Sequence, residues 1–343
     1  MKIDRRIKVV IVFSLISFLI CLISVPGAAQ KLKGPVRLKF GAMPIGSSWY
    51  IYAATYSSLL EKFLPQGSAV EVVPQGGGIA NPLAVEAGKA DIALSNVVTA
   101  RWAYDGIMLY KGRQAKNIRV LASGLNKVYA FVILREDFIK KTGLDSLQKI
   151  ADAKYPIRLV CKPEGSTAPP TARLILAQYG MSFEKIKEWG GLVIQVSGGQ
   201  IPQVVREGRA DMWVEVAPGG HPAITEAMTT TNLRMIELPE KVIKSLTKYG
   251  YYEDVVPANL FPNQPYSFKT VNPGTCIIAH ARMSNELAYM ITKVICEHKD
   301  EVVAAHASIK PFEPRKAWMS EIRGGVPLHP GAEQYYRDKG WME

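Results

Sequence analysis

The most constraining feature of this chain is a set of short motifs that occurs twice, in the same order, about 120 residues apart. Each half carries a Gly-Ser segment, then a glycine run, then a Gly-x-Ala-Asp segment. The pairs are Gly46-Ser47-Ser48 with Gly165-Ser166-Thr167, Gly76-Gly77-Gly78 with Gly198-Gly199, and residues 88–91 with 208–211. Such turns are common in α/β proteins, so coincidence is the alternative. Three matches at nearly one shift favour two related halves.

Hydrophobic runs and turn residues alternate along both halves. Strands are expected at 36–43, 69–73, 91–94, 119–122, 128–134, 158–161, 192–196 and 211–216, with helices at 48–62, 79–87, 168–179 and 201–207. A strand-helix-strand rhythm predicts mostly parallel sheets covered by helices. We therefore expect an α/β protein with two lobes, one from 30–125 plus 272–343 and the other from 126–271. A chain of this kind would hold its ligand in the cleft between the lobes.

The first 29 residues have the pattern of a cleavable signal peptide. Four basic residues precede an apolar run from Val9 to Ile23, and the small residues of 26–29 place cleavage after Ala29. An uncleaved anchor is the alternative, but the 15-residue run is short for a membrane span of about 20 residues. Cys21 lies inside the apolar run after Ile20, which does not suit a lipid anchor. We expect a periplasmic protein.

Charge and composition limit the function classes. Cleavage removes four basic residues and one acidic residue, so the net charge of +12 becomes +9. The charges are scattered, which argues against nucleic acid as a partner and favours a general attraction for anions. Cys161, Cys276 and Cys296 remain, without a CxxC pair; a Cys276–Cys296 disulfide and three free thiols are both open. The histidines form no ligand motif, so neither a metal nor a cofactor is expected.

The two Gly-Ser segments fall where a strand gives way to a helix. A helix start offers unpaired N–H groups and a partial positive charge, which together bind a carboxylate. Ser48 and Thr167 are expected as N-caps or as hydroxyls that contact the anion. Gly46, Gly78 and Gly165 allow the backbone to approach a ligand closely. Ordinary capping is the alternative for each segment taken alone.

Further candidates lie at the ends of strands and the starts of helices. Lys162 is the candidate counter-charge for a carboxylate, with a solvent-exposed lysine as the alternative, and Glu215 is a candidate for holding an amino group. Of Trp49 and Tyr50, we expect one to face the cleft and one to face away. The remaining candidates are Ser47, Asn81, Ser95, Asn96, Ser166 and Gly219. Glu215 with His221 is the nearest approach to a catalytic pair, but no nucleophile elbow accompanies it, so no catalytic residue is expected.

These motifs resemble the TAXI-type solute receptors of TRAP transporters. The resemblance rests on Gly46 to Tyr50, Gly77 to Asn81, both Gly-x-Ala-Asp segments and the tail 325–340, with its Pro/Gly turn and the pair Tyr335-Tyr336. It implies a two-lobed periplasmic binding protein fold of type II-like topology and delivery to a TRAP membrane permease driven by an ion gradient. Family ligands are typically dicarboxylates or amino acids, such as glutamate or 2-oxoglutarate.

Several residues depart from the family pattern. Trp49 stands in place of the usual first tyrosine, Ser48 replaces a threonine, and Lys162-Pro163-Glu164 and Pro169-Pro170 flank the second loop. The departures leave the identity of the ligand open. Trp49 suggests that the ligand of such a receptor could also be a hydrophobic or aromatic acid. A periplasmic ligand sensor and an exported enzyme on the same fold are the alternatives to a transport receptor.

Overall fold

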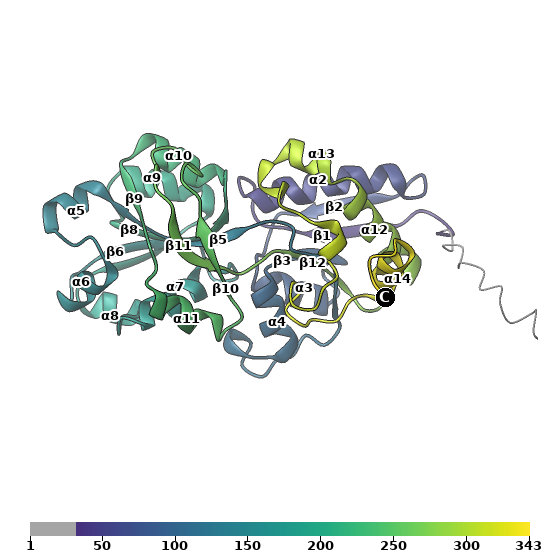
Figure 1. Cartoon of the computed structure of the whole chain (residues 1–343), viewed down its shortest axis with the longest axis horizontal. Helices are drawn as coiled ribbons and strands as arrows, with labels where there is room; N and C mark the ends of the chain where they lie inside the picture. The colour runs from purple at the N-terminus through teal and green to yellow at the C-terminus, as the bar shows by residue number, and fades with distance from the viewer. Residues whose placement is uncertain (1–31) are drawn as a thin grey trace, which may run out of the picture. The chain divides into compact units, whose positions relative to one another are not determined.

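Two five-stranded sheets organise the part of the chain that this computed structural model describes, residues 32–343 (Figure 1). The first has the order β2-β1-β3-β12-β4, formed by Ala69–Val73, Arg37–Gly41, Ile92–Ser95, Cys276–His280 and Ile118–Ser123. The second has the order β7-β6-β8-β5-β9, formed by Leu192–Gln195, Arg158–Cys161, Met212–Pro218, Val128–Arg135 and Leu233–Ile236. The predicted signal peptide, 1–29, lies outside the described residues.

The two sheets share one topology. In each, four strands run in one direction and a fifth, β12 or β5, lies antiparallel between two of them. Both antiparallel strands follow directly after the chain passes from one sheet to the other, between β4 and β5 and between β11 (Phe268–Asn272) and β12. The prediction of a mixed, mostly parallel α/β fold with two similar sheets is therefore confirmed.

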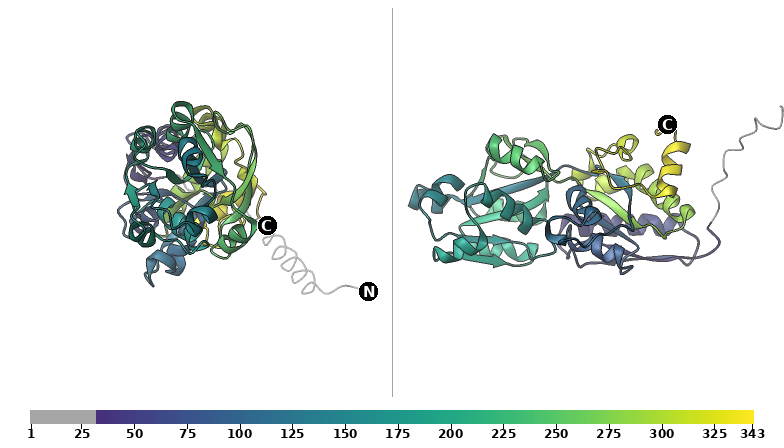
Figure 2. Two further views of the ribbon diagram at one scale, coloured as in Figure 1. Left: turned by 90° about the vertical axis from the view of Figure 1, so that its left-hand side faces the viewer. Right: turned by 90° about the horizontal axis from the view of Figure 1, so that it is seen from below.

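Helices flank both sheets, as the two further views show (Figure 2). Those beside the first sheet are α2 Ser48–Phe63, α3 Ala80–Glu86, α4 Val97–Asp105, α12 Asn285–Glu297, α13 Lys299–Ala305 and α14 Pro330–Asp338. Those beside the second are α5 Glu136–Thr142, α6 Leu147–Asp152, α7 Ala168–Ala177, α8 Phe183–Glu188, α9 Ile201–Arg206, α10 Pro222–Thr230 and α11 Glu240–Thr247. A separate antiparallel ribbon joins β10, Tyr252–Val256, to β11.

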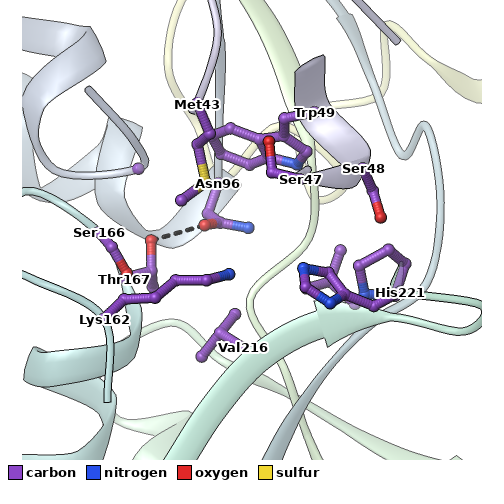
Figure 3. Close-up of a pocket in the computed structure, with 13 residues that line it drawn as sticks. Met43, Ser47, Ser48, Trp49, Asn96, Lys162, Ser166, Thr167, Val216 and His221 are labelled. Carbon is purple, nitrogen blue, oxygen red and sulfur yellow. Dashed lines mark hydrogen bonds between the residues drawn. The ribbon is translucent and has the colours of Figure 1, made fainter. Parts of the chain in front are cut away.

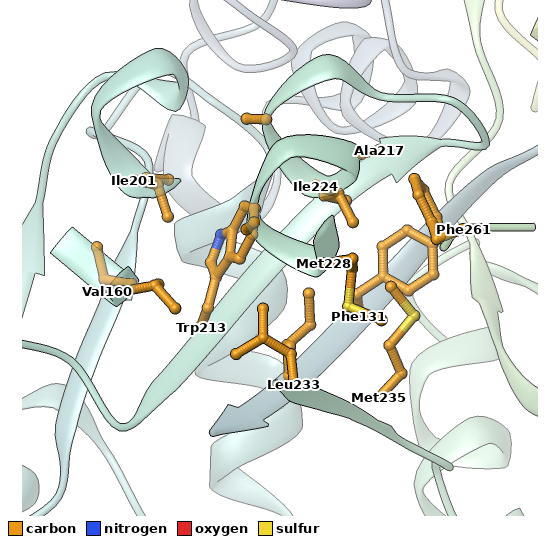
Figure 4. Close-up of a cluster of buried hydrophobic side chains, with 14 of the residues drawn as sticks. Phe131, Val160, Ile201, Trp213, Ala217, Ile224, Met228, Leu233, Met235 and Phe261 are labelled. Carbon is orange, nitrogen blue, oxygen red and sulfur yellow. The ribbon is translucent and has the colours of Figure 1, made fainter. Parts of the chain in front are cut away.

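The core of the second sheet forms around aromatic and sulfur-containing side chains (Figure 4). Seven consecutive residues of β5, 128–134, are buried, because helices cover both faces of this sheet. Phe131 meets Phe261 edge-on at 5.6 Å between ring centroids, and Trp213 of β8 is 1% exposed. This rigid core fixes the ends of β5, β6 and β8, from which binding loops extend.

The C-terminal tail packs against the first sheet. Tyr335 and Tyr336 of α14 are buried, and the Tyr336 hydroxyl donates a hydrogen bond to the Leu121 carbonyl at 2.9 Å. Leu328 bridges to Val120 just before the helix. Residues 34–343 form one compact unit, so the lobe boundaries at 125/126 and 271/272 stay a prediction.

Candidate ligand-binding site

The loop that follows β6 meets the segments that follow β2 and β3 across the space between the two sheets. The N–H groups of Ile79 and Ala80 donate to the Gly165 carbonyl at 2.9 and 3.1 Å. The Thr167 hydroxyl donates to Asn96 Oδ1 at 2.6 Å (Figure 3). We call these three hydrogen bonds the latch, because they tie the residues before α7 to residues beside β3. Ser48 and Thr167, from the two predicted loops, line one cavity.

This narrow cavity lies at the carboxyl ends of strands from both sheets, where open α/β sheets bind ligands. Its volume of about 20 Å³ has room for about one water molecule. Figure 3 shows the Lys162 amine, the Ser48 hydroxyl and the His221 ring directed toward the same space. The lining residues are Met43, Ser47, Ser48, Trp49, Gly78, Asn96, Val128, Lys162, Ser166, Thr167, Val216, Pro218 and His221.

A larger cavity of about 410 Å³ adjoins the narrow one and shares five of its lining residues. The shared residues are Met43, Ser47, Lys162, Ser166 and His221. The other walls come from the loops after β1, β2, β6 and β7, including Gly46, Gly76, Gly165 and the pair Gly198-Gly199. The glycine runs of both halves therefore contribute backbone to one space.

The start of α2 differs by one residue from the prediction. Ser47, not Ser48, is the N-cap, and its hydroxyl accepts a hydrogen bond from the Tyr50 N–H at 3.2 Å. Ser48 is 1% exposed, and its hydroxyl makes no hydrogen bond of ordinary geometry, although the buried Tyr52 hydroxyl is its neighbour. The N–H groups of Ser48 and Trp49 hold no hydrogen bond within residues 32–343. This helix start therefore presents one hydroxyl and two N–H groups that are free to bind an anion.

The start of α7 does not offer a matching anion site, which corrects the prediction for the second loop. Thr167 is the N-cap by position but makes no capping bond. The Ala168 N–H donates to the Ser166 hydroxyl at 3.1 Å, and the next two residues, Pro169 and Pro170, have no N–H. The Thr171 N–H is already bonded to the Thr167 carbonyl. The N–H of Thr167, at the N-cap, makes no hydrogen bond within residues 32–343, so this helix start keeps one N–H but no free hydroxyl.

Lys162 places a positive charge at the wall of the narrow cavity. Its amine lies 2.9 Å from Glu215 Oε1, and the two side chains are 5% and 0% exposed. The alternative of a solvent-exposed lysine is therefore wrong. Glu215 Oε1 also accepts the Val216 N–H at 2.8 Å, and Glu215 lines neither cavity. The carboxylate thus neutralises the Lys162 ammonium. Because Glu215 lines neither cavity, it is not placed for the contact with a ligand's amino group that the sequence had predicted.

His221, which the sequence suggested only as a partner of Glu215, is a residue of the site. It precedes α10, lines both cavities and is 3% exposed, and its Nδ1 has no partner. Burial, with smaller effects from Lys162 and His306, holds the pKa of His221 well below its usual value, so the ring is neutral. The sequence signal was its place at a strand-to-helix junction, after Gly219-Gly220.

The other predicted residues divide into lining and supporting roles. Trp49 is buried against the narrow cavity, whereas Tyr50 is half-exposed and lines neither cavity. The Asn81 amide donates to the carbonyls of Ala42 and Leu94 and so braces the loops below the site. Ser95 is fully buried and bonds to the Gly78 carbonyl. Gly219 lies outside both cavities, in a groove next to Leu260.

Metal ligands, disulfides and membrane-spanning helices are the other features to consider within the described residues. Within 32–343, no group of His, Cys, Asp and Glu side chains has the arrangement of a metal site. The cysteines of the same range, Cys161, Cys276 and Cys296, are buried and free, which decides between the two open alternatives for these thiols. No helix in this range has both the length and the hydropathy to cross a membrane.

Comparisons with known proteins agree with this architecture. The family model described as the NMT1-like family matches residues 40–340. MatC from Rhodopseudomonas palustris, solved with bound malate, is 13% identical with a TM-score of 0.54, over 90% of this chain and 100% of that one. A protein from Bordetella bronchiseptica RB50 is 15% identical with a TM-score of 0.52, over 90% of each chain. The periplasmic aliphatic sulphonate binding protein SsuA from Escherichia coli is 14% identical with a TM-score of 0.43, over 89% of this chain and 79% of that one. At these identities, the likeness to MatC and to the Bordetella protein is one of fold.

Proposed function

The chain belongs to the NMT1-like family, and from this premise we propose that it is the solute-binding receptor of a TAXI-type TRAP transporter. It captures a small organic anion or amino acid outside the cytoplasm and delivers it unchanged to a membrane permease. The resemblance of the Gly-Ser loops, the Gly-x-Ala-Asp segments and the tail to TAXI receptors supports the transporter class. The signal-peptide pattern of residues 1–29 supports a periplasmic location.

One observation carries the proposal. Three donors that make no hydrogen bond of ordinary geometry belong to residues that line the narrow cavity: the Ser48 hydroxyl and the N–H groups of Ser48 and Trp49. The Lys162 ammonium lies on the opposite side of the same space. Buried donors without partners are unfavourable, and a carboxylate would accept from them while the ammonium and the helix start stabilise its charge. MatC, which shares the fold, holds the carboxylic acid malate.

Ligand binding would involve movement of the lobes. The narrow cavity admits about one water molecule while the latch is formed, so entry of a ligand requires the loop 162–167 to separate from Ile79, Ala80 and Asn96. A hinge that opens and closes two lobes around a ligand is the usual mechanism of such receptors. The proposed ligand contacts are Ser48, Trp49 and Lys162, with Ser47, Ser166 and Thr167 at the wall.

A screen of carboxylic acids and amino acids tests this function. Thermal shift and calorimetry on the chain from residue 30 should find an acid that raises the melting temperature and is recovered chemically unchanged. Turnover of that acid would favour an exported enzyme, and binding without transfer to a permease would favour a sensor.

A substitution at Ser48 locates the binding site. In Ser48→Leu the larger side chain fills the narrow cavity, and we expect the affinity for the acid to fall about 100-fold, with a smaller loss of stability. Ser58→Leu, on the exposed face of the same helix, is the control and should bind as the parent does. Unchanged affinity in Ser48→Leu would remove the cavity from the proposal.

A further inference from the structure

The charges that line the two cavities are unequal. Among the residues that line them, all within the described range, Lys162 is the one side chain that carries a positive charge. It lies where the two cavities join, since it lines both of them. His221 is neutral because burial lowers its pKa. One carboxylate would thus find a cation, and a second carboxylate farther along the ligand would find none.

The larger cavity also carries an acidic group. Glu164 lines it, with its side chain 52% exposed. Its carboxylate is held by Arg173, which does not line the cavity, and by the Gln195 amide at 3.2 Å. Glu164 is therefore the one negatively charged side chain among the described residues that line this cavity, away from its junction with the narrow one. A carboxylate placed here would lose water and gain a like-charged neighbour.

Six apolar side chains and five glycines line the larger cavity, beside seven polar or charged side chains. Met43, Pro44 and Ile45 come from the loop after β1, Pro74 and Ala80 from the segment after β2, and Pro163 from the loop after β6. Ile45 is 71% exposed at this wall. A volume of about 410 Å³ is within the range of small-molecule sites.

We infer that the ligand is a monocarboxylate with an uncharged, largely apolar body. Its carboxylate binds at the narrow cavity to the Ser48 hydroxyl, the N–H groups at the start of α2 and Lys162, and its body lies in the larger cavity against Ile45 and Pro163. This inference rests on the proposed function and narrows it, because the resemblance implies dicarboxylates or glutamate. The departures Lys162 and Glu164 are the residues that shift the preference.

Matched pairs of acids test the inference by calorimetry on the chain from residue 30. Pentanoate is compared with glutarate, and 4-methyl-2-oxopentanoate with 2-oxoglutarate; each pair differs chiefly in a second carboxylate. The monocarboxylate should bind at least about tenfold more tightly in both pairs. Equal or tighter binding of the dicarboxylates overturns the inference and leaves the receptor function standing. Binding of none of the four acids overturns the inference, and the wider screen of acids and amino acids then decides the receptor function separately.

A charge added to the larger cavity provides an independent test. Gln75 is exposed, lines this cavity and makes no hydrogen bond within residues 32–343. In Gln75→Lys the affinity for glutarate relative to pentanoate should rise about tenfold, because the second carboxylate gains a cation. Gln75→Met, of similar length without charge, should not favour glutarate. A ratio that is unchanged in Gln75→Lys means that the ligand body does not lie in this cavity and overturns the inference.

Discussion

The loops that lead into α2 and α7 share a pattern but contribute different chemistry to the site. Met43-Pro44-Ile45-Gly46-Ser47-Ser48 corresponds, residue by residue, to Lys162-Pro163-Glu164-Gly165-Ser166-Thr167. Each loop follows a strand at the carboxyl end of its sheet and precedes a helix. The first loop leaves a hydroxyl and two N–H groups without a hydrogen bond of ordinary geometry, and the second engages both of its hydroxyls within the protein.

The reasons for the difference lie in a few residues. Two prolines after Ala168 remove the N–H groups that a second anion site would need, and the Ser166 hydroxyl accepts the N–H of Ala168. The Thr167 hydroxyl is engaged in the latch. In compensation, Lys162 stands where the first loop has Met43 and brings a full charge. The two related loops thus have different roles. The first supplies oriented hydrogen-bond donors, and the second supplies the charge of Lys162 and the hydrogen bonds of the latch.

The largest expected effect comes from making the second loop more like the first, by Lys162→Met. Glu215 would remain fully buried without its partner, and the free energy of unfolding should fall by about 3–5 kcal/mol, with loss of acid binding. The measurement is urea unfolding together with calorimetry. In the double variant Lys162→Met/Glu215→Gln most of the stability should return, but not the binding. If the single variant is as stable as the parent, the buried ion pair does not have the role given to it here.

An intermediate effect is expected from Gly78→Ala, which acts on the latch. An added Cβ would lie 1.9 Å from Thr167 Oγ1 and 2.8 Å from Asn96 Oδ1, so the Thr167 side chain must rotate and its bond to Asn96 is lost. Closure becomes less favourable, and affinity for the acid should fall about tenfold, or about 1.4 kcal/mol.

Two further variants decide whether Gly78 acts through Thr167. Once Thr167→Ala has removed the hydroxyl, Gly78→Ala should add little, because the two changes act on one contact. Gly34→Ala is the control, since its Cβ would meet nothing within 4 Å and the residue lines neither cavity. Additive losses in the double variant would contradict a shared latch.

The sequence was informative about the fold because it depends on patterns that repeat along the chain. Strands predicted at 69–73 and 158–161 have those bounds in the structure, and the repeated motifs anticipated two sheets of one topology. The candidate loops were chosen because they follow strands, a rule that depends on topology alone.

Roles within the site depend on contacts that the sequence does not contain. Which serine caps α2 is decided by the backbone angles of Ser47, one residue before the expected cap. Lys162 is buried because Glu215, more than fifty residues later, lies on the neighbouring strand β8. Asn81 is directed below the loops toward three backbone groups and not toward a ligand. His221 matters because α10 holds it against both cavities.

The smallest expected effect concerns His221, which lies near the residues of both loops. Its pKa is held low in the folded protein by burial, by Lys162 and by His306, while Glu215 is occupied by Lys162. Between that low value and about 6.5, the unfolded chain binds more protons than the folded one, so stability is complete above about pH 6.5 and is lost as the pH falls. For this one residue the loss between pH 7 and pH 6 is about 0.7 kcal/mol.

Unfolding of the parent and of His221→Gln at several pH values measures this contribution. The buried residues His306 and His329 also have lowered pKa values, so the parent loses stability from more than one histidine, and the quantity that counts is the difference between the two proteins. In His221→Gln the free energy of unfolding should fall by about 0.7 kcal/mol less than in the parent between pH 7 and pH 6. His298→Gln, which changes a partly exposed histidine paired with Glu301, is the control. An identical dependence in the parent and in His221→Gln would mean that the pKa of His221 is not lowered by folding. The ring would then gain a proton below about pH 6.5, and a second positive charge beside Lys162 would favour a dianion over the monocarboxylate inferred here.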